Sequence, residues 1–253
     1  MPDVCRIESA DGFCDTNPVA AGDSTTQLRQ QGIALLRDLF AKSSLTGLQE
    51  AAVRGFEAVR TEATIPEQYR FNRFSHSMLL TALVDFGCTS DELVAPLSAP
   101  GLEQLFVEAI GSEWACNMEQ SWVRKKFAPL QAPTREYHPQ GWHQDGALGV
   151  RFLSESGPVV PMTELLTCWM PLTPCGQDSP GLEFVRGRQE ALLHFTELDD
   201  SALRRRFPQK EFWAPALDPG DCLVFLNSVL HRTYTSAEMR HHRLSVEYRI
   251  FPR

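Results

Sequence analysis

The chain has 253 residues, a formal net charge of −8 and a charged-residue content of 22%, which is ordinary for a globular protein. A protein whose main partner is nucleic acid needs a basic surface that neutralises phosphates, so the negative charge argues against that class. No apolar run approaches the roughly 20 residues that a membrane-spanning helix requires. We therefore expect a globular protein that binds neither nucleic acid nor a membrane.

The cysteines favour a reducing compartment. The 7 cysteines are isolated from one another, no two form a CxxC pair, and their number is odd. This distribution is more typical of a reduced intracellular protein than of a disulfide framework or a zinc knuckle. The first residues are acidic where a secretory signal would be basic and then apolar. The sequence thus predicts a cytoplasmic protein.

Helical periodicity dominates the first half of the chain. Residues 32–40 (GIALLRDLF) have the apolar density of a strand, and residues 44–60 carry apolar side chains at helical spacing. The same spacing recurs around 75–84 and at 101–110, where a glycine follows and is expected to end the helix. The helical part of the protein is therefore predicted over about 25–112.

Short runs separated by proline and glycine dominate the second half. Five segments have the length and composition of strands, at residues 116–127, 165–172, 182–187, 222–227 and 243–251. Closely spaced strands predict a sandwich or barrel with the helices packed outside it. Because no linker or internal repeat divides the chain, we expect one domain over 1–253, with its β core at about 113–251.

Residues 141–146 (GWHQDG) place His143 and Asp145 two positions apart. In an extended segment such residues project to the same side, so both could bind one metal ion. His231 is the best third ligand, since the turn after the strand CLVFL (222–226) would deliver it to the mouth of a barrel. Two histidines and one carboxylate form the facial triad of non-haem Fe(II) oxygenases.

Other histidines remain alternatives for the third ligand. His138 lies in a loop flanked by proline, and His241 and His242 lie in a charged run. These contexts are more typical of surface histidines than of metal ligands.

The segment RLSVEYRI (243–250) alternates polar and apolar residues. As a strand it places Arg243, Ser245, Glu247 and Arg249 on one face. The guanidinium of Arg243 and the hydroxyl of Ser245 could together bind a carboxylate. A 2-oxo diacid that chelates iron at one end needs a cationic partner of this kind at the other.

The order and spacing of these segments resemble the phytanoyl-CoA dioxygenase family of Fe(II)- and 2-oxoglutarate-dependent oxygenases. The resemblance rests on GWHQDG, LLTCWMPL, SPGLEFVRG, PGDCLVFLNSVLH and RLS, over roughly residues 120–250, and extends more weakly to GIALLRDLF. It implies a mainly β protein with flanking helices, built on a double-stranded β-helix of the jelly-roll, cupin-like type.

The resemblance also implies roles for particular residues. The positions that match the iron ligands are His143, Asp145 and His231. Arg243 matches the arginine that binds the far carboxylate of 2-oxoglutarate, and Thr233 falls where the family often has a hydroxyl that helps to hold this cosubstrate. Trp169 matches an aromatic residue that lines the cosubstrate pocket, although a tryptophan in an apolar strand is equally typical of a core.

The sequence departs from the family pattern beside the expected site. Residues 185–189 are VRGRQ where the family commonly ends in Pro-Gly-Ser-His. Some members use a basic residue upstream, near the cosubstrate. Arg124 and Lys126 share a strand face and are candidates to bind cosubstrate or substrate, although two charged residues in this pattern are more typical of a solvated face. Residues 146–163 form a long segment with glycine and proline that could act as a lid.

The resemblance implies an enzyme that uses Fe(II), 2-oxoglutarate and dioxygen to hydroxylate an unactivated C–H bond of a small-molecule metabolite, with release of succinate and carbon dioxide. The same chemistry supports desaturation or cyclisation. A cupin-type metal enzyme that does not use 2-oxoglutarate is a rival, but it has no need of the carboxylate clamp at Arg243 and Ser245. A catalytically silent binding module would usually have lost a metal ligand, whereas all three candidates are present here.

Overall fold

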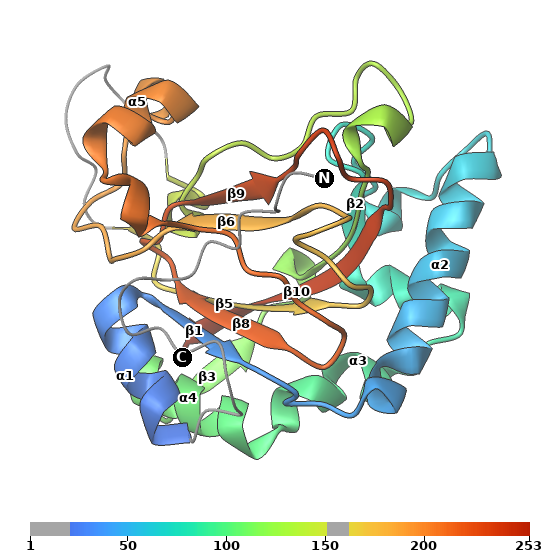
Figure 1. Ribbon diagram of the computed structural model, residues 1–253. Helices are drawn as coiled ribbons and strands as arrows, with labels where there is room; N and C mark the ends of the chain where they lie inside the picture. Colours follow the sequence, from blue (N-terminus) through green and yellow to red (C-terminus); the bar gives the residue numbers. More distant parts are fainter. Residues whose placement is uncertain (1–20, 151–161) are drawn as a thin grey trace, which may run out of the picture.

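The computed structural model describes residues 21–150 and 162–253, and shows two antiparallel β-sheets that face each other (Figure 1). The strands are β1 (Ile33–Leu36), β2 (Ser77–Leu79), β3 (Trp114–Cys116), β4 (Trp122–Lys126), β5 (Leu166–Pro171), β6 (Gly181–Val185), β7 (Phe212–Trp213), β8 (Cys222–Leu226), β9 (His231–Tyr234) and β10 (Arg243–Pro252). Within the described residues the large sheet has the order β1-β8-β5-β10-β4-β2, with β3 beside the end of β10. The small sheet has the order β7-β6-β9.

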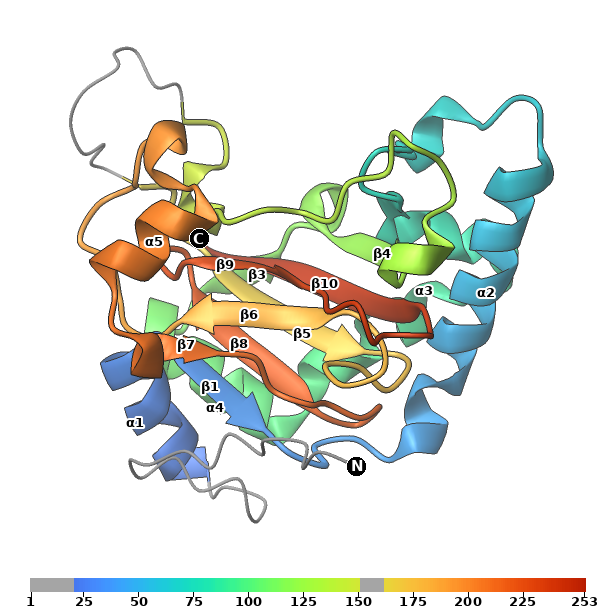
Figure 2. The ribbon, with the colours of Figure 1, turned by 45° about the horizontal axis from the view of Figure 1, so that its top comes forward.

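Helices cover the outer face of the large sheet, as Figure 1 shows. The α-helices are α1 (Ala21–Gln31), α2 (Thr46–Thr61), α3 (Ser90–Val94), α4 (Pro100–Ile110) and α5 (Asp200–Arg206). Of these, α1 to α4 lie along the large sheet, whereas α5 stands at one end of the small sheet (Figure 2). In the described part of the chain, no helix is both long and apolar enough to cross a bilayer.

The helices form where apolar residues recur at helical spacing. In α2 the buried positions include Leu48, Ala52, Phe56 and Val59, which follow one another on a single face of the helix. In α4 a proline occupies the first turn, where a missing N–H is tolerated, and Gly111 with φ of 97° follows the last residue. The buried faces of both helices join one apolar core against the large sheet.

The strand β10 has an apolar face and a polar face, which lie on opposite sides of the large sheet. Its apolar residues Leu244, Val246, Tyr248 and Ile250 pack into the core beneath the helices. Its polar residues therefore face the small sheet, as the alternation in the sequence predicts. Half of the space between the sheets is apolar, and its buried residues are Ile33, Leu35, Trp169, Cys175, Leu182, Phe184, Leu217, Leu223, Phe225 and Val229. The other half holds the charged residues of β4 and β10.

Most of the predicted elements are confirmed. Strands occur within each of the five predicted segments and within 32–40, and the helices at 44–60 and 101–110 are present. The helix expected around 75–84 is wrong. Ser77–Leu79 is a strand that pairs with β4, and a 3₁₀ helix follows over Leu80–Phe86. The side chains of this segment are buried on more than one side, which gives apolar residues at a spacing that resembles a helix. Most of the segment expected to act as a lid lies outside the described residues.

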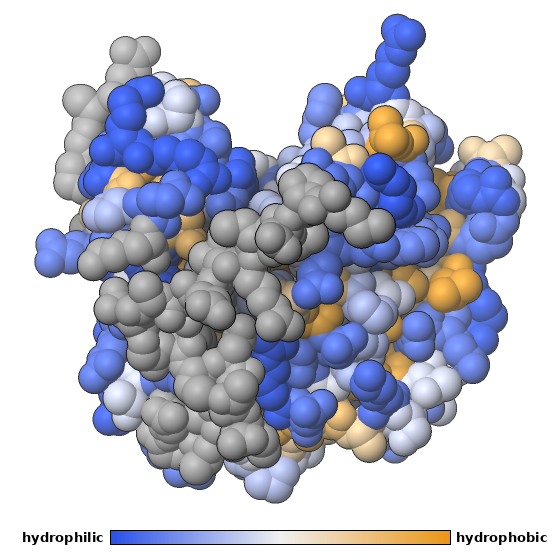
Figure 3. All heavy atoms as spheres, in the orientation of Figure 1, coloured by the Kyte–Doolittle hydropathy of each residue, from blue (hydrophilic) through white to orange (hydrophobic). Residues whose placement is uncertain are grey.

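The visible surface in Figure 3 is mainly hydrophilic, with hydrophobic side chains in small separate spots outside the grey atoms. The exposed large apolar residues of the described chain include Phe74, Leu130 and Phe195. Scattered apolar residues of this kind are normal on a protein surface.

Gly176→Ala is expected to destabilise the fold. Gly176 has φ of 91°, and a Cβ there would lie 2.2 Å from the carbonyl oxygen of Pro215, in the segment that precedes β8. Backbone strain of about 1–3 kcal/mol and a similar cost of about 1–3 kcal/mol from overpacking would lower the free energy of unfolding. Urea denaturation measures this loss.

Gly187→Ala provides the control for this prediction. Gly187 has φ of 103°, but a Cβ there meets nothing within 4 Å. Its replacement should therefore cost only the strain, about 1–3 kcal/mol. Equal losses for the two variants would show that the close approach to Pro215 is unimportant.

Candidate metal centre

Three side chains that could bind a metal ion meet at one end of the small sheet. His143 and His231 exchange backbone hydrogen bonds, each with N···O of 3.0 Å, so the segment around His143 extends the small sheet beside β9. Asp145 begins a short 3₁₀ helix two residues later. Its carboxylate lies 3.8 Å from Nε2 of His143 and 3.7 Å from Nε2 of His231. The three ligand atoms all lie within 4.8 Å of one another.

Backbone carbonyls orient both imidazole rings. Nδ1 of His143 is 2.8 Å from the oxygen of Gly141, and Nδ1 of His231 is 3.1 Å from the oxygen of Val229. With Nδ1–H donating to a carbonyl, the lone pair of each ring is at Nε2, which faces Asp145. The side-chain amide of Gln140 lies 2.9 Å from Nε2 of His143, so it is the group that a metal ion would displace.

The ionisation of the three groups suits a metal cation. Withdrawal of the ring from water and the neighbouring His231 lower the pKa of His143 to about 3, and burial lowers the pKa of His231. Burial raises the pKa of Asp145, but Arg249 and the two histidines outweigh it and hold this pKa below its ordinary value. At neutral pH the site therefore presents two neutral imidazoles and a carboxylate, the donor set that non-haem Fe(II) prefers.

The alternative histidines lie elsewhere. The side chain of His241 is 72% exposed and lies 3.5 Å from Asp178. His138 and His242 are exposed as well. Among residues 21–150 and 162–253, the cluster of His143, Asp145 and His231 is the one that could hold a metal ion.

A narrow cavity lies between the sheets next to this cluster. It is lined by Arg124, Lys126, Gln140, His143, Trp169, Leu182, Phe225, His231, Thr233, Arg243 and Glu247. The structure thus brings three of the four predicted cosubstrate residues, and both predicted upstream basic residues, to the same cavity as two of the candidate metal ligands. The fourth, Ser245, lies between Arg243 and Glu247 on the inner face of β10 and is fully buried.

Arg243 is a buried cation with unused hydrogen-bonding capacity. Its side chain is 1% exposed, it donates to the oxygen of Gly181 at 2.8 Å, and its guanidinium carbon lies 5.0 Å from the centre of the Trp169 ring. In the described chain Arg243 makes no ion pair, and neither its Nε nor the hydroxyl of Ser245 has a hydrogen-bond partner. Buried polar groups without partners are costly, so this pair fits an anionic ligand that supplies them.

The expectation of a solvated face at Arg124 and Lys126 is wrong. Lys126 is directly opposite Arg243 in the pairing of β4 with β10, and it is fully buried. It donates to the oxygen of Ser75, and burial lowers its pKa well below the ordinary value. Arg124 binds the carboxylate of Glu247 through two nitrogens, at 2.7 and 2.6 Å. The small sheet and the segment around Gln140 cover both side chains, so they face the cavity and not solvent.

Several residues of this site were not singled out from the sequence. Arg249 forms an ion pair with Asp145 and another with Glu247, and Thr167 donates to Asp145 at 2.5 Å. Glu247 and Arg249 lie on the strand face that carries Arg243, so the alternation in β10 could have identified them. Thr167 could be found only from the pairing of β5 with β10, where it lies opposite Arg249.

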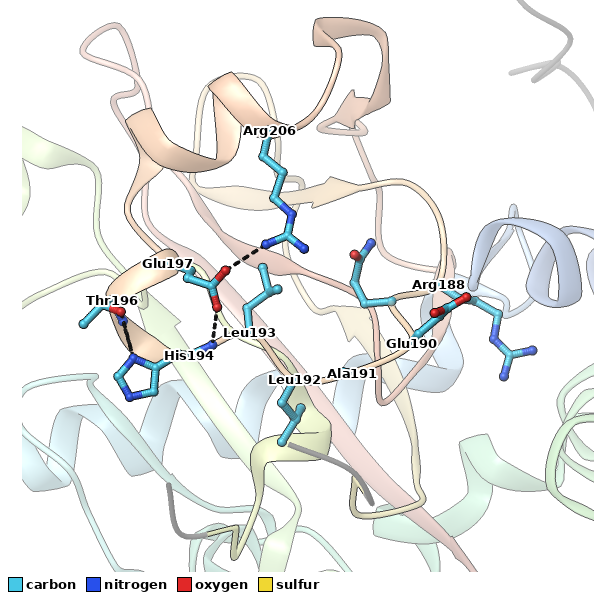
Figure 4. A pocket seen from close by; sticks show the side chains of 10 residues that line it. Arg188, Glu190, Ala191, Leu192, Leu193, His194, Thr196, Glu197 and Arg206 are labelled. Carbon is cyan, nitrogen blue, oxygen red and sulfur yellow. Dashed lines mark hydrogen bonds and ion pairs between the residues drawn. The ribbon is translucent and has the colours of Figure 1, made fainter. Parts of the chain in front are cut away.

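A second, more open hollow lies on the outside of the segment that precedes α5 (Figure 4). Ten residues line it: Arg188, Gln189, Glu190, Ala191, Leu192, Leu193, His194, Thr196, Glu197 and Arg206. Gln144, which lies between two of the metal-binding residues, donates to the oxygen of Ala191 and accepts from the N–H of Leu193. The wall of the hollow is thus tied directly to the metal-binding segment.

A sequence model described as phytanoyl-CoA dioxygenase (PhyH) matches residues 28–242. The chain belongs to this family. It is accordingly a non-haem iron dioxygenase that depends on 2-oxoglutarate, and its metal-binding cluster has the composition that such an enzyme needs. The double-stranded β-helix with flanking helices that the sequence predicts is confirmed by the paired sheets.

Several solved structures share this fold. EctD from S. alaskensis, solved with 2-oxoglutarate and 5-hydroxyectoine, has a TM-score of 0.66 and 16% identity, covering 96% of this chain and 80% of its own. The epimerase SnoN from nogalamycin biosynthesis has a TM-score of 0.61 and 16% identity, covering 93% and 84%. The carbocyclase SnoK from the same biosynthesis has a TM-score of 0.62 and 14% identity, covering 94% and 87%. No curated protein matches the chain in sequence.

Proposed function

We propose that this dioxygenase hydroxylates an unactivated C–H bond of a small-molecule metabolite. In the proposed centre the iron ligands are His143, Asp145 and His231. When bound, Fe(II) and 2-oxoglutarate supply an oxidant derived from dioxygen, with succinate and carbon dioxide as co-products. Three protein ligands occupy one face of an octahedron and leave three positions for 2-oxoglutarate and dioxygen.

The buried, unpaired guanidinium of Arg243 is the observation that carries this proposal. Arg243 and Ser245 bind the far carboxylate of 2-oxoglutarate through the donors that lack a partner in the protein. Lys126 lies opposite Arg243 in the strand pair, and its amino group adds a further hydrogen-bond donor to this carboxylate. This assignment moves Lys126 from the substrate to the cosubstrate. Thr233 and Trp169 line the cavity between this anion site and the iron ligands.

The remaining groups orient and enclose the reactants. The carbonyls of Gly141 and Val229 hold the imidazoles with Nε2 toward the metal position. Leu182 and Phe225 line the apolar side of the cavity and keep water away from the bound cosubstrate. Arg124 is held by Glu247, so its charge is already compensated, and it borders the cavity rather than binding a free anion.

The rival functions lack support at this cavity. A metal enzyme that does not use 2-oxoglutarate has no use for a buried cation without an anionic partner next to its metal centre. A silent binding module has no need to keep three metal ligands within 4.8 Å of one another, with both rings oriented by carbonyls. Both arguments favour a 2-oxoglutarate-dependent enzyme.

Addition of 2-oxoglutarate to the anaerobic Fe(II)-loaded protein should produce a weak visible charge-transfer band, because the cosubstrate chelates the metal directly. The titration measures the dissociation constant of 2-oxoglutarate. Succinate, which lacks the 2-oxo group, should produce no such band. A folded protein that binds Fe(II) but shows no band with 2-oxoglutarate would contradict the proposal.

A further inference from the structure

Four charged side chains form a continuous chain across the polar half of the cavity. Arg124 binds both carboxylate oxygens of Glu247, and Glu247 accepts a further hydrogen bond from Nη2 of Arg249 at 2.9 Å. Nη1 of Arg249 in turn donates to Oδ2 of Asp145 and to the hydroxyl oxygen of Thr167. Arg249, Glu247 and Asp145 are all buried. Because the charges alternate in sign, Glu247 and Arg249 each lie between two opposite charges, and Asp145 ends the chain.

The two oxygens of Asp145 differ in their surroundings. Oδ2 accepts hydrogen bonds from Arg249 and from the hydroxyl of Thr167. No described residue donates a hydrogen bond to Oδ1, which lies 3.8 Å from Nε2 of His143. Oδ2 lies 3.7 Å from Nε2 of His231, so both oxygens face the metal position. They differ in that Oδ2 is already held by two protein donors, whereas Oδ1 is free of protein donors and available to a metal ion.

The number of carboxylate oxygens that bind the metal decides what else can bind. An octahedral ion with three protein ligands has three positions left. A carboxylate that chelated through both oxygens would take one of these three. Two-point binding of 2-oxoglutarate together with dioxygen needs all three positions, so a second carboxylate oxygen would compete with both molecules for the metal.

We propose that Arg249 is a positioning residue that restricts Asp145 to a single metal-binding oxygen and so keeps a coordination position open. Thr167 assists it at the same oxygen, and the pair of Arg124 with Glu247 holds the guanidinium in place. This inference rests on the proposed function, since it concerns the ligand Asp145. A residue that only compensated the buried charge of Asp145 would not need to control which of its oxygens binds the metal.

The test compares Arg249→Met with the wild-type protein under anaerobic conditions. Fe(II) affinity should change less than 2-oxoglutarate affinity, because three ligands remain and the carboxylate gains freedom to bind. The dissociation constant of 2-oxoglutarate, read from the charge-transfer band, should rise at least about tenfold, because the second carboxylate oxygen competes for a position that the cosubstrate needs. Crystal structures of the Fe(II)-loaded proteins should show one oxygen of Asp145 on iron in the wild type and two in the variant.

Two further variants separate positioning from a structural role. Thr167→Val removes the other donor to Oδ2 without changing any charge, and it should weaken 2-oxoglutarate binding in the same direction but less; it also serves if Arg249→Met does not fold. Arg37→Met is the matched control, because Arg37 binds the buried carboxylate of Asp221 at 2.8 Å at the end of β1. It should lower stability and leave 2-oxoglutarate affinity unchanged.

The outcomes that would overturn the inference are distinct from a failure of the proposed function. Single-oxygen binding of Asp145 in both Arg249→Met and Thr167→Val, or unchanged 2-oxoglutarate affinity in both, would show that Arg249 only compensates charge. Parallel loss of Fe(II) and 2-oxoglutarate binding would also overturn it. A wild-type protein that binds Fe(II) without a charge-transfer band would instead refute the proposed function, while the oxygen count at Asp145 would still test the role of Arg249.

Discussion

His231→Ala should reduce the conversion of 2-oxoglutarate to succinate by more than about 100-fold. Removing a residue that only orients a metal ligand costs up to about 100-fold, and loss of the ligand itself should cost more. His231 is the first residue of β9, it is 4% exposed, and its Nε2 lies 3.7 Å from Asp145. Its removal leaves one imidazole and one carboxylate, too few to fix the geometry of the metal centre. Fe(II) retained after anaerobic dialysis and succinate formation measure the two losses.

His241→Ala is the control for this experiment. His241 is one of the alternative ligands considered from the sequence, and it lies in the connection from β9 to β10. Its side chain is 72% exposed. Its replacement should leave both Fe(II) binding and succinate formation unchanged. Full activity of His231→Ala together with loss of activity in His241→Ala would refute the proposed ligand set.

Arg243→Met should weaken 2-oxoglutarate binding by about 100-fold or more, because each hydrogen bond to a charged group contributes about 1.5–3 kcal/mol and every 1.4 kcal/mol is about tenfold in affinity. Fe(II) binding should be retained, since Arg243 contacts no metal ligand. The anaerobic titration with 2-oxoglutarate measures the first effect and Fe(II) dialysis the second. Without cosubstrate the variant should be as stable as the wild type or more so, because it no longer buries an unpaired charge.

Lys126→Met and Arg240→Met extend this experiment. Lys126 lies opposite Arg243, so its loss should weaken 2-oxoglutarate binding in the same direction. Arg240 is exposed and donates only to nearby carbonyls, at Ala237 and Met239, so its replacement should have no effect. Equal loss of Fe(II) and 2-oxoglutarate binding in Arg243→Met would show that Arg243 supports the site as a whole and is not the anion clamp.

The sequence predicts the large sheet well because the pattern of β10 is unambiguous. One face of this strand packs against helices and the other faces polar partners, so its residues alternate with period two. The same alternation assigned Arg243 and Ser245 to the inner face. The region around 75–84 was mistaken for a helix because residues buried on several sides carry no clear period.

The charged network could not be predicted from the sequence. Asp145 and Arg249 are 104 positions apart, and their contact depends on where the segment after His143 lies against β10. Local pattern gives the face of a strand but not the residue opposite. Arg124 and Lys126 illustrate the same limit, since charged residues at alternate positions indicate a solvated face unless another layer covers them. Here the small sheet is that layer.

The paired backbones of His143 and His231 have a consequence for metal selection. Because their N–H and C=O groups bond reciprocally, the distance between the two imidazoles is set before any ion arrives. The bite of this chelate is therefore preorganised, and binding an ion costs little conformational entropy in the main chain. Ions of different radius must then be accommodated at the third corner, by the carboxylate of Asp145 and the donors that position it. Discrimination between divalent metals in this protein is thereby concentrated in a single side chain and the groups that hold it.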